Sequence, residues 1–246
     1  AAVMNAIAAG ADIRVVAPLF VQTEGSKQGI WVNKEFLAGR PFTFDLFKGQ
    51  KIGSAVGLGS MTTYFLQKEF DKVGITLRDI SFQQMPSADI LVALENGAIP
   101  FGFLIDSVWQ KADESKVMSV FRQSDTISGG SWTFGPRLLN DRRDVGEAVM
   151  RALVRTTLTH LKGDYHADQK VMDVLVSEIG IPEETIRKGA ALHFRPDFYI
   201  PLDLAAELQK AYAIVPDVLS YKDPLPEERV FDRSFLKAAG IPEPTN

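Results

Sequence analysis

The chain has 246 residues, of which 46% are hydrophobic and 24% charged, and its formal net charge is −4. This length allows one large domain or two small ones with a sizeable core. A surface that binds duplex nucleic acid would need clustered lysine and arginine, and no strong basic run is present, so nucleic acid is not expected as a partner. The absence of cysteine excludes disulfides, thiolate metal sites and cysteine nucleophiles. No apolar run reaches the roughly 18 residues that span a bilayer.

The first half of the chain alternates between short apolar runs and helical patterns. Residues 1–10 predict a helix, and residues 13–20 predict a buried strand. Further strands are expected at 28–32, from Lys51, and at 79–84, 101–105, 117–121 and 132–138; further helices are expected at 61–73, 87–96 and 108–114. Residues 38–50 are polar and turn-rich, which indicates a crossover between lobes. Because strands and helices alternate over residues 13–138, we expect an α/β fold with a mostly parallel sheet.

The second half of the chain is dominated by helical patterns. Helices are expected at 145–161, 168–179, 202–213 and 235–239. A further helix start is expected at residues 181–184, where a proline in the first turn is followed by two acidic residues. This half therefore adds helices to the α/β unit and no further run of strands.

The most distinctive segment is the glycine turn of Lys51–Ser60, which leads into the helix from Met61. Ser60 is expected to cap this helix, and Gly74 suits its C-terminal end. The apolar residues that share one face at helical spacing are Met61, Phe65, Leu66, Phe70 and Val73. Such a turn leaves N–H groups free at the positive end of the helix dipole, where a carboxylate, sulfonate or phosphate can bind. Candidate ligand-binding residues are therefore Gly59, Ser60, Met61 and Thr62; the alternative is a well-capped βα unit that binds nothing.

Several catalytic and cofactor motifs are missing from the chain. Thr62 stands where a dinucleotide-binding turn needs its third glycine, and no lysine follows as in a P-loop. His160 and His166 are six residues apart and fall on different helix faces, and His193 is distant in the sequence. No nucleophile elbow is present. We expect no cofactor, no metal site and no enzymatic activity.

Other candidate ligand residues follow the expected strands or stand out within a helix. In an open α/β sheet, ligands bind beyond the carboxyl ends of the strands, which places Gln84, Asp106 and Trp109 near a cleft. Asp106 can equally cap a helix, and Trp109 can pack in the core. Trp132 lies where the chain leaves its middle block, and Asn5 is polar within an alanine-rich helix. Packing is the alternative for Trp132, and holding a neighbouring loop is the alternative for Asn5.

The order of these segments resembles the solute-binding proteins of ABC importers, in the branch that handles nitrate, taurine and other alkanesulfonates, and thiamine-precursor pyrimidines. No single motif is specific, and the resemblance rests on the ordered set over nearly the whole chain. The segments that carry it are Met4–Ala17, Phe44–Gly53, Gly59–Ile75, Leu91–Gly97 and Phe231–Gly240. Two places depart from the family pattern: Pro100-Phe101 replace the usual Asp-Ala, and Asp106-Ser107 replace a frequent Glu-Pro.

The resemblance implies the two-lobe, type II periplasmic-binding fold. Lobe one would comprise residues 1–43 and 137–246, and lobe two residues 44–136. Family members carry a further segment before the position of Ala1, so the chain is expected to be truncated at its N-terminus, with part of the pocket missing.

The resemblance also implies a function in import. A small anionic or heteroaromatic solute would bind in the cleft between the lobes, and the protein would deliver it to the permease subunits at the membrane. The protein is expected to be a monomer that is periplasmic, or lipid-anchored outside the cell membrane.

Three other readings of the sequence stay open. One is an enzyme on the same fold, similar to the thiamine-pyrimidine synthases. The resemblance implies that such an enzyme needs a cysteine-rich iron motif, and this chain has no cysteine. A second is the effector-sensing domain of a transcription regulator, which would need a DNA-reading module upstream. A third is an unrelated α/β hydrolase or transferase.

Overall fold

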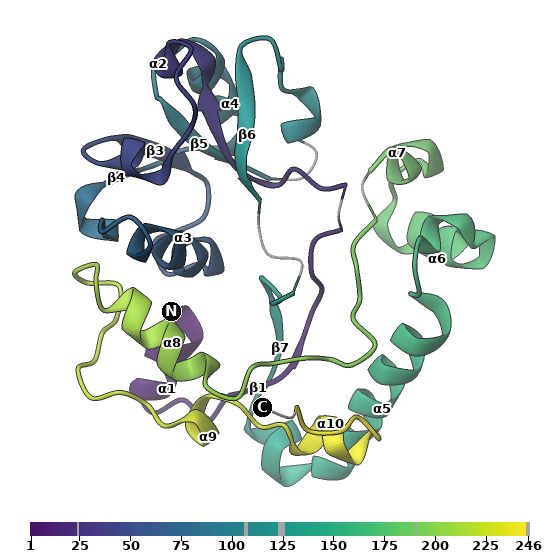
Figure 1. Ribbon diagram of the computed structural model, residues 1–246. Coiled ribbons are helices and arrows are strands. Elements are labelled where there is room, and N and C mark those ends of the chain that lie inside the picture. The colour runs from purple at the N-terminus through teal and green to yellow at the C-terminus, as the bar shows by residue number, and fades with distance from the viewer. Residues whose placement is uncertain (24, 106–107, 123–125, 190, 245–246) are drawn as a thin grey trace. The chain divides into compact units, whose positions relative to one another are not determined.

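The protein is described from a computed structural model that covers residues 1–23, 25–105, 108–122, 126–189 and 191–244, and it divides into two compact units (Figure 1). Unit 1 comprises Ala1, Gly25–Gln123 and Leu208–Leu219, and unit 2 comprises Ala2–Glu24, Ser124–Glu207 and Ser220–Asn246. These boundaries differ from those of the expected lobes, 1–43 with 137–246 and 44–136. Residues 25–43 belong to unit 1 because their strand lies inside its sheet.

Unit 1 is built on a five-stranded sheet with the strand order β4-β3-β5-β2-β6. The strands are β2 (Gly29–Asn33), β3 (Lys51–Ser54), β4 (Ser81–Gln84), β5 (Phe101–Leu104) and β6 (Val117–Arg122). Strand β3 is parallel to β4 and β5, whereas β2 is antiparallel to both β5 and β6. All strands except β2 therefore point the same way, which confirms the mostly parallel sheet and identifies β2 as the reversed strand.

Both faces of this sheet are buried. Along β2, Ile30 and Val32 enter one core cluster with the α3 residues Leu66 and Phe70, while Trp31 enters another. The second cluster also takes in the buried residues of α4, Ile90, Leu91 and Leu94. Helices α3 (Met61–Asp71) and α4 (Ser87–Glu95) thus cover opposite faces (Figure 1). All five residues of β2 are buried, as is usual for a strand in a sheet covered on both sides.

Helix α4 approaches the sheet at a pair of glycines. Gly53 of β3 and Gly102 of β5 are neighbours in the register. A Cβ atom at Gly53 would lie 2.7 Å from the Cδ1 atom of Ile99, and one at Gly102 would lie 2.6 Å from the Cγ2 atom of Ile90. The glycines therefore provide the space into which Ile90 and Ile99 pack.

Short helical elements complete unit 1, and three sequence-based expectations for this unit are wrong. They are α2 (Lys34–Leu37) and the 3₁₀ turns η1 (Phe44–Phe47), η2 (Leu77–Asp79) and η3 (Trp109–Lys111). Residues 38–50 are not a crossover, since Phe47 is fully buried in the core of unit 1. The helix expected at 108–114 is only the η3 turn. Val73 is 41% exposed and lies outside the buried face of α3, which ends at Asp71.

Unit 2 is mainly helical around a two-stranded antiparallel sheet. Strand β1 (Arg14–Pro18) pairs with β7 (Ser131–Phe134), with an irregularity between Val15 and Ala17. The helices are α1 (Ala2–Ala8), α5 (Arg143–His160), α6 (Gln169–Ile179), α7 (Glu183–Lys188), α9 (Glu227–Val230) and α10 (Ser234–Ala238), with a π-helical turn η4 (Arg137–Asp141) and a 3₁₀ turn η5 (Tyr165–Ala167). Residues 135–138, expected to be extended, instead lead into η4. Helix α8 (Leu204–Tyr212) begins in unit 2 and ends in unit 1.

The amphipathic helix α5 packs onto the core of unit 2. Its buried Met150 and Val154 join Val16 of β1, Phe134 of β7 and Phe235 of α10 in one cluster. None of the helices in the described ranges is long and apolar enough to cross a membrane.

A half-buried ion pair holds the C-terminal part of unit 2 together. Arg233, whose side chain is 16% exposed, places its Nη2 atom 2.6 Å from Glu227 Oε1, and the same atom donates to the Pro201 carbonyl at 2.6 Å. The other oxygen of Glu227 accepts from the Ala205 amide at 3.0 Å, at the start of α8. Glu227 therefore balances the charge of Arg233 and also accepts a hydrogen bond from an amide at the N-terminus of α8.

We expect Glu227→Ala to lower the free energy of unfolding by about 2–3 kcal/mol, because it leaves a largely buried guanidinium without its counter-charge. Glu228 is the matched control: it lies on the same short helix, is exposed, and has no hydrogen-bond or ion-pair partner among the described residues. Glu228→Ala should change the same free energy by less than about 0.5 kcal/mol in urea titrations. Equal losses in both variants would contradict the assigned role of Glu227.

Candidate functional site

The carboxyl ends of three parallel strands meet at one edge of the unit 1 sheet. Ser54 ends β3 and is in register with Gln84, which ends β4, and the Met85 amide donates to the Ser54 carbonyl at 3.2 Å. The end of β5 at Leu104 lies on the other side of β3. Gln84 is exposed, whereas Ser54 is buried. In open α/β sheets this edge is where ligands bind.

The turn from β3 to α3 presents unpaired amides at the same edge. The Ser54 hydroxyl donates to the Val56 carbonyl at 2.8 Å, and the Ser60 amide donates to the Gly57 carbonyl at 3.1 Å, so the turn itself is ordered by hydrogen bonds. Among the described residues, no acceptor pairs with the amides of Met61, Thr62 and Thr63. These three N–H groups lie at the positive end of the α3 dipole and are therefore suited to an anion.

The residues of the turn carry no charged side chain. Residues 53–64 contain no lysine or arginine. Gly59, Ser60 and Met61 are half-buried, and the Gly59 carbonyl accepts a hydrogen bond from the Ala1 amine at 2.7 Å. Thr62 is buried with 7% exposure, and Thr63 is buried with 1% exposure. The turn itself would therefore contribute dipoles and hydrogen bonds to an anion, with the Ala1 amine beside it.

The prediction that the Ser60 side chain caps α3 is wrong. Ser60 does occupy the N-cap position, with φ −92° and ψ 164°, but its side chain makes no hydrogen bond to a backbone amide of the helix. Its hydroxyl lies 3.5 Å from the Thr63 hydroxyl instead. The start of α3 thus lacks a side-chain cap, as does the start of α4, which follows β4 at the same edge of the sheet.

Ser60→Ala should consequently change the free energy of unfolding by less than about 0.5 kcal/mol. The matched comparison is Asp168, the N-cap of α6, whose carboxylate accepts from the Lys170 amide at 2.9 Å. Asp168→Ala should cost about 1 kcal/mol, because that capping bond is lost. Thermal and urea unfolding of the two variants provide the measurement, and a larger loss for Ser60→Ala would restore its role as a cap.

Trp109 is half-buried in η3 and packs against the core cluster that contains Ile90 and Leu104. The packing alternative therefore describes Trp109 at least in part. Asp106 lies outside the described residues.

The two candidates in unit 2 lie on separate elements. The Asn5 side-chain oxygen accepts from the Ser220 amide at 3.0 Å, so this residue of α1 holds a neighbouring loop. Trp132 lies on β7 opposite Ala17 and is 41% exposed, which means that it does not pack in the core. The structure thus brings Gly59, Ser60, Met61, Thr62 and Gln84 to one edge of unit 1, while Asn5 and Trp132 belong to unit 2.

Sequence reasoning missed a hollow at the carboxyl end of β1. It is open to solvent, encloses about 270 Å³, and is lined by Pro18, Leu19, Phe20, Val21, Ser128, Thr157, Phe194, Arg195, Phe198 and Tyr199. Arg195 contributes no net charge here, because it forms a two-pronged pair with Asp197 at 2.9 and 2.6 Å. The aromatic run from Phe194 to Tyr199 is the signal that could have pointed to it.

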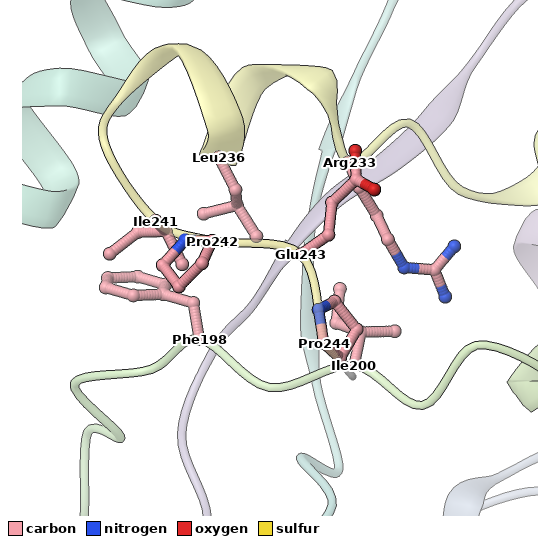
Figure 2. Close-up of a pocket in the computed structure, with 8 residues that line it drawn as sticks. All are labelled: Phe198, Ile200, Arg233, Leu236, Ile241, Pro242, Glu243 and Pro244. Atoms are coloured by element: carbon pink, nitrogen blue, oxygen red, sulfur yellow. The ribbon is translucent and has the colours of Figure 1, made fainter. Parts of the chain in front are cut away.

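A second hollow, of about 250 Å³, lies under the C-terminal tail (Figure 2). Its walls are mainly the apolar side chains of Phe198, Leu236 and Ile241, and the guanidinium of Arg233 extends away from them. The charged groups at its rim already have partners, since Glu243 pairs with Lys237 at 3.3 Å and Arg233 pairs with Glu227. The Nε atom of Arg233 is buried without a hydrogen-bond partner, but the guanidinium extends away from the apolar walls of this hollow.

In the described part of the chain, no three or more histidine, aspartate or glutamate side chains are grouped in a way that could hold a metal ion. The groups at the start of α3 are neutral hydrogen-bond donors at a helix N-terminus, and they lie at the same edge of the sheet as the exposed side-chain amide of Gln84.

Of the comparisons with known proteins, the one with solved structures gives matches. No protein-family model and no curated protein matches the sequence. Among solved structures, the ligand-binding component of an ABC-type import system from Staphylococcus aureus, with zinc bound, is 16% identical with a TM-score of 0.63, over 97% of this chain and 78% of that one. The alkanesulfonate-binding protein SsuA from Xanthomonas axonopodis pv. citri, bound to MOPS, is 18% identical with a TM-score of 0.58, over 93% and 76%. The periplasmic nitrate-binding protein NrtA from Synechocystis PCC 6803 is 11% identical with a TM-score of 0.61, over 96% and 71%.

The chain therefore has the fold of ABC-type periplasmic solute-binding proteins, as its segment order implies. Each of these three similar structures is named as a binding protein or binding component. At this level of identity the likeness establishes the fold, and the function has to be argued from the site.

Proposed function

We propose that this protein is the substrate-binding component of an ABC importer and captures a small anionic or heteroaromatic solute. The solute class comprises sulfonates such as alkanesulfonates and taurine, nitrate, carboxylates and pyrimidines. In this proposal, the solute is captured in a cleft between the two units, and the protein delivers it to permease subunits at the membrane. The fold shared with SsuA and the periplasmic protein NrtA supports it, and we propose a periplasmic location, or a lipid anchor outside the cell membrane.

The observation that carries the proposal is the set of three unpaired amides at Met61, Thr62 and Thr63. An unpaired N–H group that is kept from water costs free energy, so a helix start left without a cap favours an external acceptor. Oxygen atoms of a sulfonate, nitrate or carboxylate can accept two or three such hydrogen bonds at once. The interaction is stronger than one between neutral groups because the acceptor is charged.

Neighbouring groups would set selectivity. The exposed Gln84 amide adds a neutral donor and acceptor next to the turn, in register with Ser54. Trp109 and Trp132 supply aromatic surface, and Asp106 supplies a carboxylate after β5. We assign Gly59, Ser60, Met61, Thr62, Gln84, Asp106, Trp109 and Trp132 to the binding site and leave Asn5 in its structural role. Closure of the two units over the solute would remove water from these hydrogen bonds and strengthen them.

Met61→Pro tests the amides directly. Proline is well tolerated at the first helical position, and Ser60 already has the extended conformation that precedes proline, so the helix should persist while one N–H donor is lost. We expect the dissociation constant of an anionic solute to rise by about tenfold or more, as for loss of a hydrogen bond to a charged group. The control is Met61→Ala, which removes the side chain and keeps the amide.

The measurement begins with a panel of alkanesulfonates, taurine, nitrate, carboxylates and pyrimidines, scored by the shift in melting temperature. A true ligand at 100 times its dissociation constant should add about 2.7 kcal/mol to the free energy of unfolding. Calorimetry then compares the two Met61 variants on the best solute. If no member of the panel shifts the melting temperature, the proposal fails; equal affinity of the Pro and Ala variants would place the solute away from α3.

A further inference from the structure

Helix α4 ends in an asparagine–glycine pair on the surface of unit 1. Asn96 is the C-cap residue, with φ −91° and ψ 0°, and Gly97 follows it with φ +71°. The Gly97 amide donates to the Leu94 carbonyl at 3.2 Å, and the Ala98 amide donates to the Ala93 carbonyl at 2.9 Å. These two bonds form a Schellman motif, in which glycine is preferred because its φ is positive. Both residues of the pair are exposed, at the end of a helix where fraying begins.

The side-chain amide of Asn96 is not held by the fold, whereas those of two other asparagines are. Asn33 is 3% exposed, and its Nδ2 atom donates to the Leu94 carbonyl at 2.8 Å. Asn140 is exposed, and its Nδ2 atom donates to the Asp12 carboxylate at 2.7 Å. Among the described residues, none forms a hydrogen bond with the Asn96 side chain. Of the asparagines in the sequence, only Asn96 is followed by glycine.

We propose that Asn96 is a site of spontaneous deamidation. The Gly97 nitrogen attacks the Cγ atom of Asn96, and the side-chain nitrogen leaves as ammonia, taking up the proton that the Gly97 amide gives up. This step closes a succinimide ring. Water then opens the ring at either of its carbonyl groups, which yields aspartate or isoaspartate. Glycine favours the first step because it has no side chain to shield its nitrogen.

The Schellman motif holds this pair in an unreactive geometry. The ring can close only when the Gly97 nitrogen lies near the plane of the Cα, Cβ and Cγ atoms of Asn96, and a ψ of 0° turns that nitrogen away from it. The same N–H group is bonded to the Leu94 carbonyl. Cyclisation therefore has to follow local opening of the last turn of α4, so its rate reports how often that turn opens.

Two contacts from outside the helix keep this turn closed. Asn33, at the end of β2, donates to the same Leu94 carbonyl that accepts from Gly97. The Oε1 atom of Glu95 accepts from the Asp113 amide at 2.8 Å and so joins the turn to the segment before β6. Because Asn33 is buried and Glu95 is half-buried, Glu95 is the residue that can be varied with the smaller effect on the core.

The product carries a charge where the helix tolerates it least. Deamidation lowers the formal net charge of −4 by one and places the new carboxylate at the negative end of the α4 dipole, next to Glu95. Isoaspartate also lengthens the backbone by a methylene group, which shifts the Gly97 and Ala98 amides relative to their acceptors. Ageing of the protein should therefore loosen the end of α4, and this inference is independent of solute capture.

Peptide mapping by mass spectrometry tests the proposal on the full chain, incubated in a mildly alkaline buffer. Trypsin releases residues 79–111 as one peptide, in which Asn96 is the only asparagine. We expect this peptide to convert with time into its aspartate and isoaspartate forms, which chromatography separates. The peptides that contain Asn33 and Asn140 serve as internal controls and should stay unchanged over the same interval.

Two variants of Glu95 test whether opening of the turn controls the reaction. Glu95→Ala removes the acceptor of the Asp113 amide and should speed the conversion by about fivefold, as for loss of one hydrogen bond. Glu95→Gln keeps an acceptor oxygen at this place and should convert at the rate of the unchanged protein. Equal rates in the two variants would overturn the control by the turn. An Asn96 that stays intact in Glu95→Ala, while the isolated peptide of residues 79–111 deamidates fully, or equal conversion at Asn140, would overturn the site itself.

Discussion

Burial of the unit 1 sheet on both faces is the constraint on which the rest of this structure depends. Residues alternate between two separate core clusters along β2, with Ile30 and Val32 on one side and Trp31 on the other. A shift of one residue would exchange these side chains between clusters of different shape, so the strand register is strongly specified. That register aligns the carboxyl ends of β3, β4 and β5, and it is this alignment that brings Gln84 beside the turn before α3.

In unit 2, side-chain interactions, and not a large sheet, hold the backbone segments together. Its sheet has only β1 and β7 in the described residues, and a two-stranded sheet alone is marginally stable. The Glu227–Arg233 pair and the Ser128 hydroxyl supply bonds that a wider sheet would make through its own ladder. Arg233 and Glu227 also bond to Pro201 and Ala205, and Ser128 bonds to Leu19 and Phe20, so both sets join segments that are distant in the sequence.

The amino-acid sequence by itself determined most of the elements. Apolar spacing of 3.6 residues and local end signals are properties of neighbouring residues, so α3, α5 and α6 lie close to their expected positions, and Gly180 ends α6 in the left-handed conformation. The α/β class and the solute-binding fold could likewise be inferred from the order of the segments. The glycine turn also identified the helix start that carries the candidate site, because a turn of this kind is encoded locally.

Only the tertiary structure decided which of the available donors and acceptors form hydrogen bonds with each other. Ser60 is a residue type that commonly caps helices and it occupies the N-cap position, yet its hydroxyl lies near the Thr63 hydroxyl. The rotamer of a side chain depends on the atoms packed around it. The reversal of β2 and its membership of unit 1 depend on partners about 70–90 residues away, β5 and β6, which no local pattern encodes. The same holds for Asn5 with Ser220 and for Ser128 with Leu19 and Phe20. Non-local hydrogen bonds are chosen by the packed fold, and a linear sequence states only which donors and acceptors are available.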